Sequence, residues 1–217
     1  MPKQALSRRD FLKITGITLG TSAVACSGLA ALATYSPSVT FAESTYGEQN
    51  MSNRILITYA SKRGSTGEVA EAIGKTIAKT GARVDVLPLK KVTGLSGYQA
   101  VLIGSAIRVA KWLPEAVDFV SANRAILQRV PTAYFTVCMT LAEDTPANRT
   151  KAAGFLEPVR TVLAPAAEGY FAGKVDPQTL SFLESTMLKA KKVPQGDFRD
   201  WKKITDWAQS TYTQLCA

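Results

Sequence analysis

A short polar segment, Ser61 to Thr66, reads Ser-Lys-Arg-Gly-Ser-Thr and has the residue types that could hold a phosphate group. Its three hydroxyl groups can hydrogen-bond phosphate oxygens, and Gly64 lets the backbone turn tightly. A helix following this segment would add free N–H groups and the positive end of its dipole, while Lys62 and Arg63 add charge. A serine or threonine in this place can also be a simple helix cap.

The order of residues in this segment limits which phosphate-containing ligands it could bind. The segment consists of Ser61, Lys62, Arg63, Gly64, Ser65 and Thr66. The segment is neither Gly-x-Gly-x-x-Gly, typical of dinucleotide sites, nor Gly-x-x-x-x-Gly-Lys-Ser/Thr, typical of nucleoside triphosphate sites. The chain has no histidine, which excludes His-ligated metal sites and Ser-His or Cys-His nucleophile pairs. We therefore predict no metal site and no catalytic side chain, and any redox chemistry must come from a bound organic cofactor.

The elements around this segment alternate between apolar strands and amphipathic helices. Helices are expected after Ser65, where Val69, Ile73 and Ile77 recur every four residues, and over residues 114–127, 148–163 and 198–215. In the last of these helices Trp201 is expected to face inward. Strands are expected at Arg54–Ala60, Arg83–Leu89, Ala100–Ile107, Thr132–Thr140 and Ala167–Val175. This alternation predicts an α/β fold, a doubly wound five-stranded parallel sheet with strand order 2-1-3-4-5. The phosphate segment would then lie at the carboxyl end of the first strand, where ligands bind in such sheets.

The N-terminal residues resemble an export signal. Residues 7–13 read Ser-Arg-Arg-Asp-Phe-Leu-Lys, which matches the twin-arginine pattern throughout, and an uncharged stretch follows over residues 14–33. The resemblance implies the twin-arginine translocase as a partner during export. It also implies a protein that is periplasmic or lies on the outer face of the cytoplasmic membrane. A basic patch before an ordinary secretory signal is the alternative.

We expect residues 1–42 to be the signal peptide, residues 43–53 a linker, and residues 54–217 one α/β domain. Cleavage is expected after Ala42, because small residues occupy the positions that a signal peptidase reads. Attachment of a lipid at Cys26 and a retained, uncleaved anchor are the alternatives. Cys138 and Cys216 remain in the domain, and two cysteines do not make a disulfide framework.

The charge of the chain indicates an anionic partner. The chain has 26 basic and 17 acidic side chains, a net charge of +9; residues 1–42 hold four basic and one acidic, so 22 and 16 remain. A basic surface suits a membrane with acidic lipids, a carboxylated substrate or an acidic redox protein. Lys189, Lys191 and Lys192, beside Met187 and Leu188, could rest on a membrane surface or form a solvated face. Nothing in the sequence indicates binding to nucleic acid.

Three segments together resemble one subgroup of the flavodoxins. They are the phosphate segment, residues 100–108 followed by Trp112, and residues 196–201, which read Gly-Asp-Phe-Arg-Asp-Trp. The subgroup contains the menaquinone-dependent protoporphyrinogen dehydrogenases, and the similarity covers nearly all of residues 54–210. It implies an FMN cofactor whose phosphate is held by residues 61–66. By the same resemblance the isoalloxazine ring would lie between two further segments, formed by Ser105, Ala106 and Arg108 and by Cys138, Met139 and Thr140.

Other readings of these residues remain open. Arg108 can be a solvated loop charge, Cys138 a small core residue, and Trp112 either a lid over the ring or a packing residue at a helix entry. The subgroup's haem-pathway enzymes work in the cytoplasm, which conflicts with an export signal. We therefore expect an exported FMN oxidoreductase that exchanges electrons with a quinone or a membrane-associated partner. Protoporphyrinogen oxidation, a non-enzymatic electron carrier and a fold that has lost its cofactor are the alternatives.

Overall fold

The computed structural model describes residues 39–48, 53–190 and 192–216. The twin-arginine motif, Cys26 and Lys191 lie outside these residues. Residues 39–176 and 194–217 form one compact unit, and residues 177–193 belong to another. Within the described part of the chain, we find no helix that is long and apolar enough to cross a membrane.

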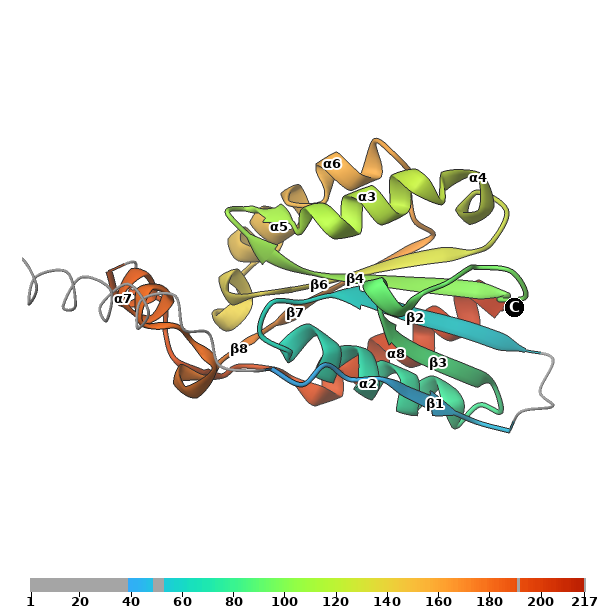
Figure 1. Ribbon diagram of the computed structural model, residues 1–217, viewed down its shortest axis with the longest axis horizontal. Coiled ribbons are helices and arrows are strands. Elements are labelled where there is room, and N and C mark those ends of the chain that lie inside the picture. The colour runs from blue at the N-terminus through green and yellow to red at the C-terminus, as the bar shows by residue number, and fades with distance from the viewer. Residues whose placement is uncertain (1–38, 49–52, 191, 217) are drawn as a thin grey trace, which may run out of the picture. The chain divides into compact units, whose positions relative to one another are not determined.

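The main unit is built on a parallel sheet of five strands (Figure 1). Its order is β3-β2-β4-β6-β7, which is 2-1-3-4-5 in the chain order of these five strands, so the predicted α/β fold is confirmed. The strands are β2 (Arg54–Ala60), β3 (Arg83–Pro88), β4 (Ala100–Arg108), β6 (Thr132–Cys138) and β7 (Ala167–Ala172). Strands β2 and β6 are almost fully buried, as expected of parallel strands covered on both faces.

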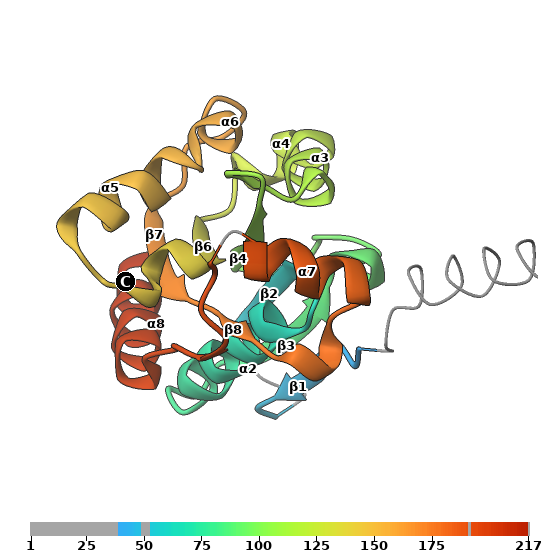
Figure 2. The same cartoon turned by 90° about the vertical axis from the view of Figure 1, so that its left-hand side faces the viewer.

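Two layers of helices cover the sheet (Figures 1 and 2). On one face α2 (Ser65–Ala78) and α8 (Trp201–Cys216) bury Val69, Ile73 and Ile204 against the strands. On the other face α3 (Pro114–Ala122), α4 (Arg124–Leu127) and α6 (Glu157–Arg160) bury Val120, Leu127 and Val159. The helix α5 (Pro146–Gly154) packs Ala152 near the end of β6, beside Cys138.

A further strand lies within the segment expected to be a linker. Strand β1 (Ser44–Tyr46) pairs antiparallel with β3, and Thr45 is opposite Asp85. The hydroxyl of Thr45 donates to Asp85 Oδ1 at 2.9 Å, so the pairing is supported by a side chain as well as by the backbone. Sequence analysis did not predict this strand, because three polar residues carry little hydrophobic alternation.

Several elements are shorter than their patterns indicated. The helix expected over residues 114–127 is divided at Asn123, and the one expected over residues 148–163 is divided between Gly154 and Glu157. Trp201 was expected to face inward, but it is 43% exposed, so that prediction is wrong. Its ring instead lies against the guanidinium of Arg199, with 4.4 Å from Cζ to the ring centroid.

The chain leaves the sheet after β7 and returns before α8. Two short strands, β8 (Lys174–Val175) and β9 (Gly196–Asp197), pair antiparallel at the base of this excursion. Between them lies the second unit, whose main element is α7 (Phe182–Ala190). Ser181 and Glu184 cap this helix reciprocally, because each backbone N–H donates to the side chain of the other.

Candidate functional site

The loop after β2 has the geometry of an anion site. The Ser61 Oγ accepts a hydrogen bond from the backbone N–H of Gly64 at 3.0 Å, which closes the turn. Gly64 adopts a left-handed conformation with φ of 84° and precedes the first residue of α2, Ser65. The first N–H groups of a helix have no carbonyl partner inside it, and Gly64 has no side chain that could cap them. The loop therefore presents donors that a phosphate could accept.

The side chain of Thr66 gives the most direct test of whether a phosphate fits this loop. Its side chain is fully buried in the first turn of α2. Its Oγ1 has no hydrogen-bond partner within the part of the chain that the structure describes. A buried hydroxyl without a partner costs free energy, so such atoms are rare unless something else satisfies them. The residues present therefore fit a phosphate group held by this loop, as an FMN cofactor would require.

The ends of three elements meet beside this loop. A Cβ atom placed on Gly173, directly after β7, would lie 3.6 Å from Met139 Sδ and 3.9 Å from Ser65 Oγ. The structure thus brings Ser65 of α2 and Met139, which follows β6, to the same point. Gly173 was not singled out from the sequence, although a glycine at a strand end is a recognised signal of close approach.

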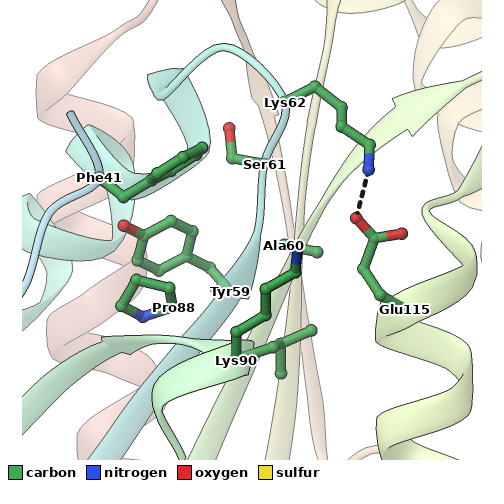
Figure 3. A pocket seen from close by; sticks show the side chains of 9 residues that line it. Phe41, Tyr59, Ala60, Ser61, Lys62, Pro88, Lys90 and Glu115 are labelled. Carbon is green, nitrogen blue, oxygen red and sulfur yellow. Dashed lines mark hydrogen bonds and ion pairs between the residues drawn. The ribbon is translucent and has the colours of Figure 1, made fainter. Parts of the chain in front are cut away.

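Two guanidinium groups, those of Arg63 and Arg108, lie close enough at the loop to interact. Burial, and next the nearby charge of Arg108, lower the pKa of Arg63 below the ordinary value of a guanidinium. Two guanidinium groups held this close favour an anion near them. Lys62 has a different neighbour, because its Nζ forms an ion pair with Glu115 Oε1 of α3 at 2.8 Å (Figure 3).

Ser105, Ala106 and Arg108 lie in the last part of β4 and differ in their burial and contacts. Ser105 is fully buried; its hydroxyl accepts from the N–H of Leu113 at 3.0 Å and donates to the Ala106 carbonyl at 2.9 Å. Its side chain therefore offers no free hydroxyl to a ligand. Ala106 is partly buried, while Arg108 is exposed where β4 pairs with β5 (Lys111–Trp112).

Trp112 is a packing residue and does not form a lid. It is only 3% exposed, and its Nε1 donates to the Thr136 hydroxyl at 2.8 Å. Its ring centroid is 5.0 Å from that of Tyr134 in β6. Of the two roles considered for this tryptophan, the structure supports packing at the entry to α3.

Of the three residues at the end of β6, Cys138 is buried, whereas Met139 and Thr140 are partly exposed. Cys138 is buried, and its burial raises the pKa of the thiol, against hydrogen bonds with Leu141 and Thr140 that lower it. The thiol is therefore protonated near neutral pH and behaves as a small core residue. Met139 and Thr140 are partly exposed in the turn that follows, so their side chains remain accessible at the strand end.

The segment from Gly196 to Trp201 binds the helix that carries the loop. Arg199, whose side chain is 3% exposed, donates to Glu68 Oε2 at 2.7 Å and to Asp197 Oδ2 at 2.6 Å. Glu68 lies in the first turn of α2. The motif is recognisable in the sequence but its partner is not, because Glu68 and Arg199 are 131 residues apart.

A cavity of about 180 Å³ adjoins the loop on the side of β3 (Figure 3). Its lining combines aromatic, basic and acidic side chains: Phe41, Tyr59, Ala60, Ser61, Lys62, Pro88, Leu89, Lys90 and Glu115. Phe41 was assigned to the signal peptide by the sequence. It lies here next to Tyr59, which was treated only as a strand residue.

Comparisons with known proteins agree with the fold of the main unit. The family described as Flavodoxin domain matches residues 56–201 of this chain. A short-chain flavodoxin associated with a bacterial microcompartment aligns with a TM-score of 0.50 at 11% identity, covering 75% of this chain and 99% of that one. At this identity the structural likeness concerns the fold alone.

The curated relatives that match this chain share the name of one enzyme. A Leishmania major protein named protoporphyrinogen IX dehydrogenase [quinone] is 27% identical over 168 residues, which are 73% of this chain and 72% of the relative. A protein of the same name from Escherichia coli K12 is 23% identical over 164 residues, which are 72% of this chain and 90% of the relative. The similarity supports an oxidoreductase, at low identity.

Proposed function

This chain belongs to the flavodoxin domain family, and on that premise we propose that it is an exported FMN-binding oxidoreductase that exchanges electrons with a quinone or another membrane-associated partner. The observation that carries the proposal is the buried Thr66 hydroxyl, which has no partner among the described residues and lies at the start of α2. A mononucleotide phosphate would satisfy this atom together with the N–H groups of the loop.

The chain's own residues would do three things for the cofactor. Ser61, Gly64, Ser65 and Thr66 would bind the phosphate, and Lys62 and Arg63 would add charge to the same loop. Ala106 and Arg108 on one side, and Met139 and Thr140 on the other, would orient the ring, with Ser105 and Cys138 supporting them from within the core. The flavin supplies the electron chemistry, while a nearby cation such as Arg108 favours the reduced ring.

The export part of the proposal rests on residues 7–13 alone. A folded protein carrying a cofactor is a natural cargo for a twin-arginine translocase, because the cofactor is loaded before transport. Fractionation of cells that produce the full chain tests this: the protein should leave the cytoplasm, and Arg8→Lys with Arg9→Lys should retain it there. Equal distribution of both forms would refute the export signal.

Oxidation of protoporphyrinogen IX is the alternative activity, favoured by the names of the curated relatives. A second alternative is a non-enzymatic electron carrier, which passes electrons between other proteins and catalyses no reaction itself. The purified, FMN-loaded full chain should be reduced chemically and mixed anaerobically with menadione. If the proposal is right, menadione alone reoxidises the flavin rapidly. If the chain is only an electron carrier, rapid reoxidation requires a protein partner. Consumption of protoporphyrinogen, with quinone as acceptor, would identify the haem-pathway reaction.

Contact with a membrane is proposed for α7. Phe182, Leu183 and Met187 are exposed on this helix, at 73%, 57% and 52%, and exposed Lys189 and Lys192 follow them. An apolar and basic helix suits a surface of acidic lipids. The full chain should co-sediment with vesicles containing phosphatidylglycerol and not with purely zwitterionic vesicles, and Phe182→Ser with Met187→Ser should release it. Equal sedimentation of the variant and the unmodified chain would contradict the assignment to α7.

A further inference from the structure

Residues 39–46, which we call the strap, pack against α2, the helix that follows the phosphate loop. Val39 Cγ1 lies 3.1 Å from the position that a Cβ of Gly64 would occupy, and Thr40 O lies 3.5 Å from it. Further along, Tyr46 OH donates to Glu71 Oε1 of α2 at 2.8 Å. The strap therefore contacts α2 at the residue before its first turn and again near its middle.

Tyr59 links the strap to the first turn of α2. This tyrosine is 1% exposed, and its OH donates to the carbonyl oxygen of Ala42 at 2.8 Å. A Cβ on Gly67 would lie 2.7 Å from Tyr59 Cζ, so the ring lies directly against the backbone of α2 at that residue. One buried side chain thus touches both the strap and the turn that contains Thr66.

The far end of the strap is fixed independently. Strand β1 pairs with β3, and the Thr45 hydroxyl donates to Asp85, which is buried. Because β1 is anchored in the sheet, residues 39–42 are held against the loop. The strap lies outside the matched family region, which begins at residue 56.

We propose that the strap positions the phosphate loop, so that seating of the strap and binding of a mononucleotide phosphate are coupled. This inference rests on the proposed function. A loop already held in its bound arrangement loses less conformational freedom when the phosphate binds. By thermodynamic reciprocity, the bound phosphate holds the strap more firmly in return.

The coupling bears on the predicted cleavage after Ala42. The carbonyl of Ala42 belongs to the bond that a peptidase would cut there, and it is the oxygen that Tyr59 binds. Strand β1 begins only two residues later. Cleavage at this bond would therefore require the strap to leave its place, and it would remove residues 39–42 from the loop. The folded domain should resist that cut and should keep these residues.

Two matched tyrosine variants of the full chain test the coupling. Tyr59→Phe removes the bond to Ala42 and keeps the ring against Gly67. Tyr134→Phe is the control, because Tyr134 is also fully buried in a strand and its OH also donates to a backbone carbonyl, that of Leu163 at 3.0 Å. The dissociation constants of FMN and of riboflavin, which lacks the phosphate, are measured by quenching of flavin fluorescence.

We expect Tyr59→Phe to weaken FMN about threefold, as the loss of one hydrogen bond allows, and to leave riboflavin unchanged. The control should alter neither ligand. If Tyr59→Phe leaves the ratio of the two constants unchanged, or changes both ligands equally, the strap does not position the phosphate loop.

A second measurement separates this inference from the proposed function. Hydrogen exchange of residues 61–67 is followed in the ligand-free full chain and in both variants. Faster exchange in Tyr59→Phe than in Tyr134→Phe supports the strap even if the unmodified chain binds no FMN, a result that would overturn only the proposed function. Equal exchange in the two variants would refute the strap.

Discussion

At the scale of single residues, the Thr66 hydroxyl separates a phosphate site from a simple helix cap. A capping threonine would bond the backbone of its own helix, whereas Thr66 Oγ1 has no partner among the described residues. Thr58 offers the comparison, because its Oγ1 is also buried without a partner in that part of the chain but lies inside β2. Both hydroxyls are buried without a partner among the described residues, but Thr66 lies in the loop and the first turn of α2, whereas Thr58 lies within β2.

Substitution of Thr66 by valine should weaken FMN without weakening the fold. Loss of a hydrogen bond to a charged phosphate corresponds to about 2 kcal/mol, so the dissociation constant should rise about 30-fold. Removal of an unsatisfied buried hydroxyl should leave the free energy of unfolding equal or higher.

Thr58→Val is the matched control for that substitution. It should have the same effect on urea unfolding and no effect on the dissociation constant of FMN. A loss of FMN affinity in both variants, or in neither, would count against the assignment of Thr66 to the phosphate.

The position of the loop between β2 and α2 could be predicted from the sequence, because an apolar strand, a polar segment and a helix pattern are local information. Roles that depend on distant partners could not. Arg199 and Glu68 meet only in the folded chain, and Trp112 lies against Tyr134 because β4 and β6 are neighbours. The prediction for Trp201 was wrong for the same reason: its helical phase is inward, yet stacking on Arg199 holds it at the surface.

At the scale of elements, close contact between β4 and β6 depends on Gly104. These strands pair with Gly104 beside Phe135, and a Cβ on Gly104 would lie 2.0 Å from the Phe135 Cζ atom. The Phe135 ring is fully buried, so it has no space into which it could turn. The strand that leads to Ser105 and Arg108 is therefore positioned by an aromatic ring lying over a glycine.

Gly104→Ala should destabilise the protein by about 3 kcal/mol, because the new methyl group overpacks the core. Gly154→Ala is the control, since among the described residues nothing beyond its chain neighbours and its own helix backbone lies within 4 Å of its Cβ position at the end of α5. Urea unfolding should place the control within about 0.5 kcal/mol of the unmodified protein. Similar stability of the two variants would show that Phe135 relaxes freely.

The five parallel strands and their order could be predicted, because buried strands and amphipathic helices alternate with clear periods. The breaks at Asn123 and after Gly154 could not, since the apolar pattern continues across them. Strand β1 was missed because its place depends on hydrogen bonds to β3 and on Tyr59, not on its own hydrophobicity.

At the scale of the whole molecule, the absence of histidine shapes the response to pH. Burial alone would raise the pKa of Asp85, but bonds from Tyr98, Thr45 and Arg54 outweigh it and lower the pKa. The bond from Arg199 likewise lowers the pKa of Asp197. Such carboxylates contribute stability above their unfolded pKa, and this contribution is lost as pH falls through the folded pKa.

Groups with raised pKa values act at the other end of the pH range. Burial, assisted by the bond to Asp85, raises the pKa of Tyr98 to about 12, and burial also raises the pKa of Cys138. Their stabilising contributions are complete below the unfolded pKa values, which are about 10 for tyrosine and about 8.5 for cysteine. They are lost as pH rises through the folded values.

The free energy of unfolding should therefore change by less than about 1 kcal/mol between pH 6 and pH 8, and it should fall below about pH 4. Urea unfolding across pH 3 to 8 measures this dependence. A steep change near pH 6.5 would contradict these assignments, because no side chain in the chain has an ordinary pKa there.

The central claim, that the loop from Ser61 to Thr66 holds the phosphate of a flavin mononucleotide, is tested most directly by titrating the full chain with FMN and with riboflavin. The account predicts one FMN per chain and a dissociation constant at least about 30-fold lower for FMN than for riboflavin, since only FMN reaches Thr66 and the N–H groups of α2. Equal affinity for the two flavins, or no binding of FMN, would contradict it.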